Sequence, residues 1–168
     1  MALSSPEIVD TSGLRLNKDA CVVIVRTEWN AHVVDLLEEG CVKILKEKGI
    51  CIKIIEVPGA VEISFAIKSY WEHHQYKCDK PQAFIALGCV IKGDTPHFEY
   101  VCNAVTNGIT ELNLLLSVPT IYGVLTVNNQ LQADERTGGA HGHKGEEAAA
   151  TAIKMIALTE SFKTLPNS

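Results

Sequence analysis

Residues 21–57, which read CVVIVRTEWNAHVVDLLEEGCVKILKEKGICIKIIEV, predict a strand, a helix and a second strand in succession. Val22–Arg26 is a short β-branched run typical of a buried strand. In the segment after it, apolar residues recur at helical spacing, at Val33, Val34, Leu37, Cys41, Ile44 and Leu45. We expect Asn30 to cap this helix and Gly49 to follow its end, before the strand Cys51–Val57. A strand–helix–strand unit of this kind favours a parallel sheet.

The rest of the chain repeats this alternation. Further strands are predicted over Ala83–Leu87 and Thr120–Val127. Helical patterns are predicted over 63–71, 98–116, 130–136 and 146–162, and loops over 72–80, 88–93 and 138–145. The fold class is therefore α/β, a three-layer flavodoxin-like sandwich with a four-stranded parallel sheet. Such sheets bind ligands at the carboxyl ends of their strands, which here are 29–30, 58–64, 88–97 and 128–129.

Length and composition narrow the class of protein. A chain of 168 residues fits one domain, residues 1–168, and we expect residues 1–20 to form an extended arm. Hydrophobic residues make up 46% and charged residues 21%, which excludes a disordered tail or a collagen-like fibre. The net charge of −5 disfavours a nucleic-acid groove, so no nucleic-acid partner is expected.

The sequence predicts a cytoplasmic protein without a membrane partner. No apolar run approaches the ~18 residues that span a bilayer, and the first residues lack the apolar region of a signal peptide. The six cysteines form no CxxC pair. Four of them, Cys21, Cys41, Cys51 and Cys89, lie within or beside apolar stretches, so we expect reduced and mostly buried thiols.

Residues 88–101, GCVIKGDTPHFEYV, carry the clearest candidate for an anion site. Gly88, Gly93 and Thr95 match the spacing of a P-loop, but Asp94 stands where the phosphate-binding lysine belongs. Its carboxylate would repel the phosphates of a nucleotide, so a nucleoside triphosphate site is not expected. Two alternatives stay open: a glycine turn that binds one small phosphate monoester at a helix N-terminus, and a tight structural turn.

Four other side chains are candidates for chemistry, and each has an unremarkable alternative. His97, in the first turn of the following helix, is either a proton shuttle or a surface histidine. Arg136 and Lys144 flank a glycine-rich loop and are either phosphate ligands or solvated surface charges. Trp29 could stack on a planar ring or cover the rim of the core.

Two more features complete the candidates. Glu62 could accept hydrogen bonds from a polyol or occupy the first turn of a helix, where the helix dipole favours it. His141-Gly-His143 lacks the cysteine or carboxylate spacing of a metal centre, so no metal site is predicted.

Taken together, these segments resemble the lumazine synthase family (6,7-dimethyl-8-ribityllumazine synthase). The resemblance runs from Val22 to the last helix and rests on the following blocks: Trp29-Asn30, VPGAVEI (57–63), GCVIKGDTPHFEYV (88–101), PTIYGVLT (119–126), and Arg136 with HKG (143–145). It implies condensation of 5-amino-6-(D-ribitylamino)uracil with 3,4-dihydroxy-2-butanone 4-phosphate in riboflavin biosynthesis. No metal or organic cofactor is expected, and the substrates are two small molecules.

The resemblance also implies roles for individual residues. Trp29 would stack on the pyrimidine, Asn30 would help to hold it, and His97 would transfer protons. The ribityl chain would meet Ala60, Val61 and Glu62. The heterocycle would contact the backbone of Cys89, Val90 and Ile91. The phosphate would be bound by the backbone amide of Asp94, by Thr95 and by Arg136. The site would be completed by Tyr122 and Lys144.

In this family Tyr122, Arg136 and Lys144 would come from a neighbouring subunit, so the resemblance implies a homo-oligomer with active sites at its interfaces. Family members form pentamers, paired pentamers or icosahedral shells, and the short loop 138–145 favours the icosahedral capsid. Residues 1–20 could add a strand to a neighbour's sheet.

Several residues depart from the family pattern. Trp29 and Tyr122 replace phenylalanine, and Val61, Ser64, His141 and His143 are also unusual at their positions.

Two other functions remain open. One alternative is a non-catalytic flavodoxin-like module that binds or carries a flavin. The other, more remote, is a structural shell or storage protein.

Overall fold

The computed structural model describes residues 9–17 and 19–164 and contains one four-stranded sheet. The elements, in chain order, are β1 (Cys21–Thr27), α2 (Ala31–Glu47), β2 (Cys51–Val57), a 3-10 turn (Ala60–Glu62), α3 (Ile63–His74), β3 (Ala83–Ile91), α4 (His97–Leu115), β4 (Thr120–Val127), α5 (Gln130–Asp134), β5 (Thr137–Gly139), β6 (Gly142–His143) and α6 (Lys144–Thr164).

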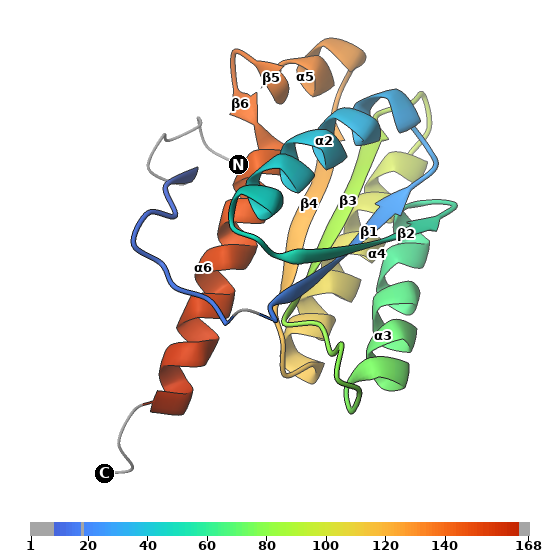
Figure 1. Cartoon of the computed structure of the whole chain (residues 1–168). Helices are drawn as coiled ribbons and strands as arrows, with labels where there is room; N and C mark the ends of the chain where they lie inside the picture. Colours follow the sequence, from blue (N-terminus) through green and yellow to red (C-terminus); the bar gives the residue numbers. More distant parts are fainter. Residues whose placement is uncertain (1–8, 18, 165–168) are drawn as a thin grey trace.

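The four long strands are all parallel and lie in the order β2-β1-β3-β4, which confirms the predicted α/β sandwich. Helices α2 and α6 cover one face of the sheet, and α3 and α4 cover the other (Figure 1). Strand β1 is buried on both faces: Val22 and Ile24 belong to the core under α2 and α6, whereas Val23 and Val25 belong to the core under α3 and α4. This explains why its sequence is continuously apolar rather than alternating.

Several predicted boundaries differ from the structure. Strand β3 continues to Ile91 and pairs with β4 as far as Val127, so residues 88–91 are strand and not loop. A Cβ atom on Gly88 would lie 3.2 Å from Thr27 Cγ2, so this glycine serves close strand packing and not a turn. Helix α3 extends to His74, and the predicted loop 138–145 contains the β5–β6 hairpin and the first residues of α6.

The described part of the N-terminal arm, residues 9–17 and 19–20, packs on its own chain and contains no strand. Leu14 and Leu16 lie against the core under α2 and α6, and Asn17 Nδ2 donates a hydrogen bond to Glu160 Oε1 at 2.7 Å. Residues 1–8 and 18, which the prediction also included, lie outside the described residues. A strand added to a neighbour's sheet therefore stays a prediction.

The cysteines follow the expected pattern with one exception. All six are free thiols, and Cys21, Cys41 and Cys89 are buried. Cys51 is exposed, which corrects the prediction, because it lies at the start of the edge strand β2. Across the described ranges, no helix has the length and apolar character needed to cross a membrane.

Candidate functional site

A cavity of about 590 Å³ opens where β1, β2 and β3 end and α4 begins. This is the carboxyl edge of the sheet, where parallel sheets bind their ligands. The cavity is lined by Thr27, Trp29, Asn30, Gly59, Ala60, Val61, Glu62, Cys89, Val90, Ile91, His97 and Val101. The structure therefore brings together the predicted residues of three separate sequence blocks, namely those at 29–30, 60–62 and 89–91, with His97.

Trp29 and Asn30 form the rim that follows β1. The backbone N–H groups of Glu28 and Trp29 donate to the carbonyls of Val57 (2.9 Å) and Pro58 (3.3 Å), which ties this loop to the end of β2. The Trp29 side chain is 73% exposed and lines the cavity. An indole held this way can stack on a planar ring without moving the backbone.

Asn30 stands at the N-cap position of α2, as predicted, but its side chain does not cap the helix. Its backbone is left-handed, with φ 57° and ψ 40°, a conformation that asparagine tolerates better than most residues. Its Nδ2 instead donates to the Cys89 carbonyl at 2.8 Å. Asn30 therefore links the ends of β1 and β3 and fixes one wall of the cavity.

The loop after β2 brings Glu62 close to Trp29. A Cβ atom on Gly59 would lie 2.9 Å from Glu62 Oε2 and 3.7 Å from Trp29 Cδ1. The missing side chain at Gly59 thus makes room for both groups. The exposed Glu62 carboxylate, at the start of α3, can accept hydrogen bonds from a hydroxylated ligand.

Cys89 supplies a neutral wall on β3. Burial, with a smaller contribution from the Asp134 charge, raises the pKa of its thiol to about 11. The thiolate is the nucleophilic form of cysteine, and it is scarce near neutral pH at such a pKa. Cys89 therefore contributes shape and backbone groups to the cavity rather than a nucleophile.

His97 is the first residue of α4 and lines the cavity with an exposed imidazole. Asp94 and Thr95 precede it in an exposed loop and are not among the described residues that line the cavity. Because residues 88–91 are strand, the glycine turn predicted to bind a phosphate is reduced to residues 92–96.

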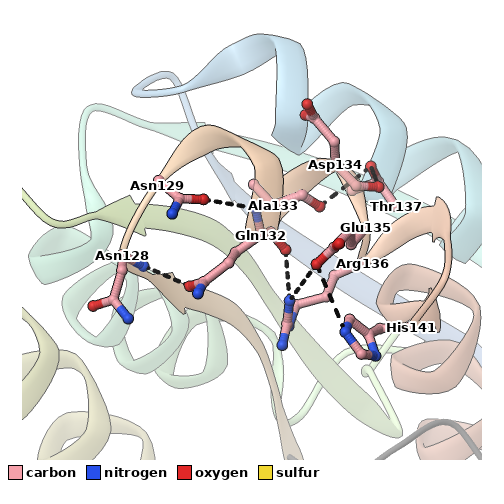
Figure 2. Close-up of polar contacts among 9 residues, drawn as sticks. All are labelled: Asn128, Asn129, Gln132, Ala133, Asp134, Glu135, Arg136, Thr137 and His141. Carbon is pink, nitrogen blue, oxygen red and sulfur yellow. Dashed lines mark hydrogen bonds and ion pairs between the residues drawn. The ribbon is translucent and has the colours of Figure 1, made fainter.

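Arg136 lies outside the cavity, in the segment between α5 and α6. We call residues 130–147 the α5–α6 junction. Arg136 Nη1 donates to the Gln132 carbonyl at 2.8 Å and lies 3.8 Å from Glu135 Oε2. The same carboxylate oxygen is 3.6 Å from His141 Nε2, so Glu135 lies between the two side chains (Figure 2).

The polar residues before Arg136 build the short helix that positions it. Asn129 Oδ1 accepts from the Gln132 N–H at 3.0 Å, and Gln132 Oε1 accepts from the Asn128 N–H at 2.9 Å (Figure 2). This reciprocal cap orders α5, and the Gln132 carbonyl then receives Arg136. His32, in the first turn of α2, is hydrogen-bonded to Gln130 at 2.9 Å. Asn128-Asn129, predicted as a ligand loop, is thus a helix cap.

Lys144 is buried, which corrects the alternative of a solvated loop lysine. Its side chain is 3% exposed, and its Nζ donates to both Glu147 carboxylate oxygens, at 2.7 and 2.9 Å. The start of α6 packs directly on α2, because a Cβ atom on Gly145 would lie 2.0 Å from the Leu37 carbonyl oxygen. Sequence reasoning missed Glu147, although its spacing of three from Lys144 marks a helical ion pair.

His143 and Tyr122 also lie outside the cavity. The His143 ring lies against Gly40 of α2, where an added Cβ atom would come within 2.2 Å of Cε1. Tyr122, on β4, is half-buried and its hydroxyl lies 3.3 Å from Thr106 Oγ1. Burial raises the pKa of the Tyr122 hydroxyl. Within the described part of the chain, no group of three or more His, Cys, Asp or Glu residues is placed to hold a metal ion.

Most of the chain matches known proteins. A family model described as 6,7-dimethyl-8-ribityllumazine synthase matches residues 19–160. A protein of that name from Porphyromonas gingivalis is 44% identical over 152 residues, which cover 89% of this chain and 91% of the relative. Relatives of the same name from Parabacteroides distasonis (46% identical, 79% of this chain and 82% of the relative) and Cytophaga hutchinsonii (48% identical, 81% and 84%) also match.

Proposed function

Because this chain belongs to the 6,7-dimethyl-8-ribityllumazine synthase family, we propose that its cavity is one half of an active site that a second copy of the chain completes. The protein is a transferase. It condenses 5-amino-6-(D-ribitylamino)uracil with 3,4-dihydroxy-2-butanone 4-phosphate, releases phosphate and water, and forms 6,7-dimethyl-8-ribityllumazine in riboflavin biosynthesis. No finding favours the flavin-carrier alternative.

The cavity suits the ribitylaminouracil. Its volume of about 590 Å³ lies within the range usual for small-molecule sites. In the proposed arrangement Trp29 stacks on the pyrimidine, and Asn30 holds the wall formed by Cys89, Val90 and Ile91. Ala60, Val61 and Glu62 face the ribityl chain, with the Glu62 carboxylate accepting its hydroxyl protons.

The absence of cations in the cavity supports a site shared between two chains. The described residues that line it include no lysine or arginine, whereas one substrate carries a phosphate monoester with about −1.5 to −2 charges at neutral pH. Arg136 is held outside the cavity of its own chain by Gln132. We therefore assign phosphate binding to groups from two chains. Arg136 comes from a neighbouring copy, whereas Thr95 and the Asp94 backbone amide come from the chain that holds the cavity.

Tyr122 and Lys144 are proposed to belong to the same neighbouring copy. Tyr122 would line the shared site, and Lys144 would lie close to the substrates, held in place by its ion pair with Glu147. Exposed apolar side chains lie near both halves: Val61 (49% exposed) and Phe65 (78%) beside the cavity, and Leu131 (66%) on α5. In the proposed assembly a neighbouring copy would cover these side chains.

The chemistry requires positioning and proton transfer. The amine of one substrate adds to the ketone of the other, an imine forms, phosphate leaves, and the ring closes. His97, at the mouth of the cavity, would carry protons to and from these groups. Holding the two substrates together supplies much of the acceleration, since the amine is already nucleophilic.

We further propose that residues 1–168 act as one domain within a pentamer. The tight β5–β6 hairpin favours assembly of pentamers into an icosahedral shell. The cytoplasm is the proposed compartment, because buried cysteines such as Cys21, Cys41 and Cys89 are typical of reduced structural thiols.

Mixed assembly tests the shared site. His97→Ala and Arg136→Ala chains are unfolded, mixed in equal amounts, refolded, and assayed at low butanone phosphate concentration. Each site needs an intact His97 from one chain and an intact Arg136 from its neighbour, and each of these is present half of the time. Random mixing should therefore restore about a quarter of the wild-type sites. Each variant refolded alone is the control. Activity no higher than the average of the two controls would place both residues in one chain, and a stable monomer in native mass spectrometry would do the same.

A further inference from the structure

Two cysteines face each other at the end of the sheet opposite the cavity. Cys21 begins β1 and Cys51 begins β2, and the two are register partners in the parallel ladder. Neighbouring strands lie about 4.8 Å apart, within the range of about 4.4–6.8 Å between Cα atoms that a disulfide requires. Register partners on parallel strands also present their side chains to the same face of the sheet.

The two side chains share one face of the sheet, near enough for Cys51 to add to the effect of burial on the pKa of the Cys21 thiol. Gln82 Oε1 accepts from the Cys21 backbone N–H, which fixes the start of β1. At the spacing of neighbouring strands, the bridge needs no large movement of either strand.

The two thiols differ in access. In the single chain, Cys21 is 3% exposed, whereas Cys51 is exposed at the start of the edge strand β2. Burial, with a smaller contribution from Cys51, raises the pKa of Cys21 to about 12, so Cys21 is a slow nucleophile near neutral pH. A small oxidant therefore meets Cys51 first, and Cys21 reacts with the oxidised sulfur only because the register of the two strands holds the two side chains together.

We propose that Cys21 and Cys51 form a reversible disulfide when a hydroperoxide oxidises the protein. The Cys51 sulfur attacks the peroxide O–O bond, which gives a sulfenic acid and one alcohol or water. The Cys21 sulfur then attacks the Cys51 sulfur, the S–O bond breaks, and a water molecule leaves with the Cys21 proton. The two sulfurs together lose two electrons, and a dithiol reductant returns them by thiol–disulfide exchange.

The bond would clamp the edge strand β2 to β1 at the amino ends of the strands. The cavity lies at their carboxyl ends, so the clamp changes resistance to unfolding and not turnover. Cys78 is the matched control, because it is also exposed and lies in the loop between α3 and β3. Cys41 and Cys89 are buried and belong to the core under α2 and α6.

Peptide mapping tests the proposal on the intact assembled protein. The protein is treated with hydrogen peroxide, free thiols are blocked in urea with iodoacetamide, and the digest is analysed by mass spectrometry with and without dithiothreitol. We expect a Cys21–Cys51 peptide pair two hydrogens lighter than the reduced peptides. We also expect a midpoint of thermal unfolding about 5 °C higher, reversed by dithiothreitol.

Two variants make the outcome decisive. Cys51→Ser should abolish both the linked peptide and the thermal shift, whereas Cys78→Ser should keep both. A Cys51–Cys78 link, a link between two chains, or a Cys51 sulfinic acid beside an unmodified Cys21 would each overturn the proposal. None of these readouts uses the synthase assay, so their failure would leave the proposed function untouched.

Discussion

The cavity and the α5–α6 junction differ in the charge that they carry and in how freely their side chains can meet a ligand. The cavity presents apolar side chains, backbone groups, one histidine and one carboxylate, and it is open to solvent. The junction holds its cations with partners of its own: Arg136 is bound to the Gln132 carbonyl, and Lys144 is buried with Glu147. The cavity can therefore receive a planar, hydroxylated ligand but lacks charge, while the junction carries charge that is fixed in advance. Such fixed charge is most useful to a second molecule placed against it.

The largest expected effect breaks the junction. Lys144→Met removes the lysine that donates to both oxygens of the buried Glu147 carboxylate, and should lower the free energy of unfolding by about 3–5 kcal/mol. The double variant Lys144→Met/Glu147→Leu should recover most of this loss, because it removes both buried charges. Urea unfolding of the three proteins measures the effect. Equal stability of the single and double variants would show that the pair does not hold the junction together.

The next largest effect is expected on turnover, from a substitution in the cavity. His97→Ala should lower kcat about 100-fold, because it removes the proposed proton carrier, and should leave the unfolding midpoint unchanged since the side chain is exposed. His73→Ala, an exposed histidine on α3, is the control and should keep the wild-type rate. Steady-state kinetics of correctly assembled protein decide the matter, and a wild-type kcat for His97→Ala would discard the role.

Arg136→Ala should act on binding more than on turnover. Loss of a charge-assisted hydrogen bond to phosphate is worth about 2 kcal/mol, so the KM for the butanone phosphate should rise about 30-fold. The KM for the ribitylaminouracil should stay near the wild-type value. Arg136→Lys should recover part of the loss, because it keeps the charge but not the planar fork. Unchanged KM values would mean that the phosphate binds elsewhere.

Raised pH should weaken the cavity wall. The folded-state pKa of Cys89, about 11, lies above the ordinary value of about 8.5, so its contribution to stability is complete below about pH 8.5 and is lost as the pH rises toward 11. The expected loss reaches about 1.4 kcal/mol per pH unit in this window. Cys89→Ala should make the fall of the unfolding free energy with pH shallower by that amount. Parallel curves for the two proteins would contradict the shift.

The smallest expected effect concerns the aromatic rim. Trp29 presents a larger face than phenylalanine, and we expect riboflavin to quench its fluorescence on titration. Trp71 is buried in the core under α3 and α4 and serves as an internal reference. Trp29→Phe should remove the quenching and weaken riboflavin binding about threefold. Titrations of the two proteins that superimpose would end the idea.

The same contrast explains what the sequence could predict. Strands β1 and β4 are rich in β-branched residues, so their positions could be predicted from the sequence. The bounds of β4, Thr120–Val127, were predicted correctly. Parallel strands end at one edge, so grouping of the blocks at 29–30, 60–62 and 89–91 with His97 was also within reach. These positions depend on the order of elements and not on side-chain partners.

The positions that sequence reasoning missed depend on partners far along the chain. Gly88 suggested a loop, but its small size serves the packing of β3 against Thr27, and no local pattern reports that contact. Asn30 suggested a cap, but its amide is drawn to the Cys89 carbonyl, a residue 59 positions away. Lys144 suggested a mobile loop because Gly145 follows it, whereas that glycine is what lets α6 pack on Leu37.

Helix α2 touches both regions, and this has a consequence for the assembly. Its first turn follows Asn30 at the cavity rim and carries His32, which binds Gln130 of the junction; about two turns from Asn30, Leu37 receives the start of α6. In a ring where the junction of each subunit completes the cavity of the next, helix α2 of each subunit therefore connects two neighbouring sites. A substitution in the first two turns of α2 would therefore disturb two neighbouring sites at once, one through Asn30 and the other through Gln130 or the start of α6.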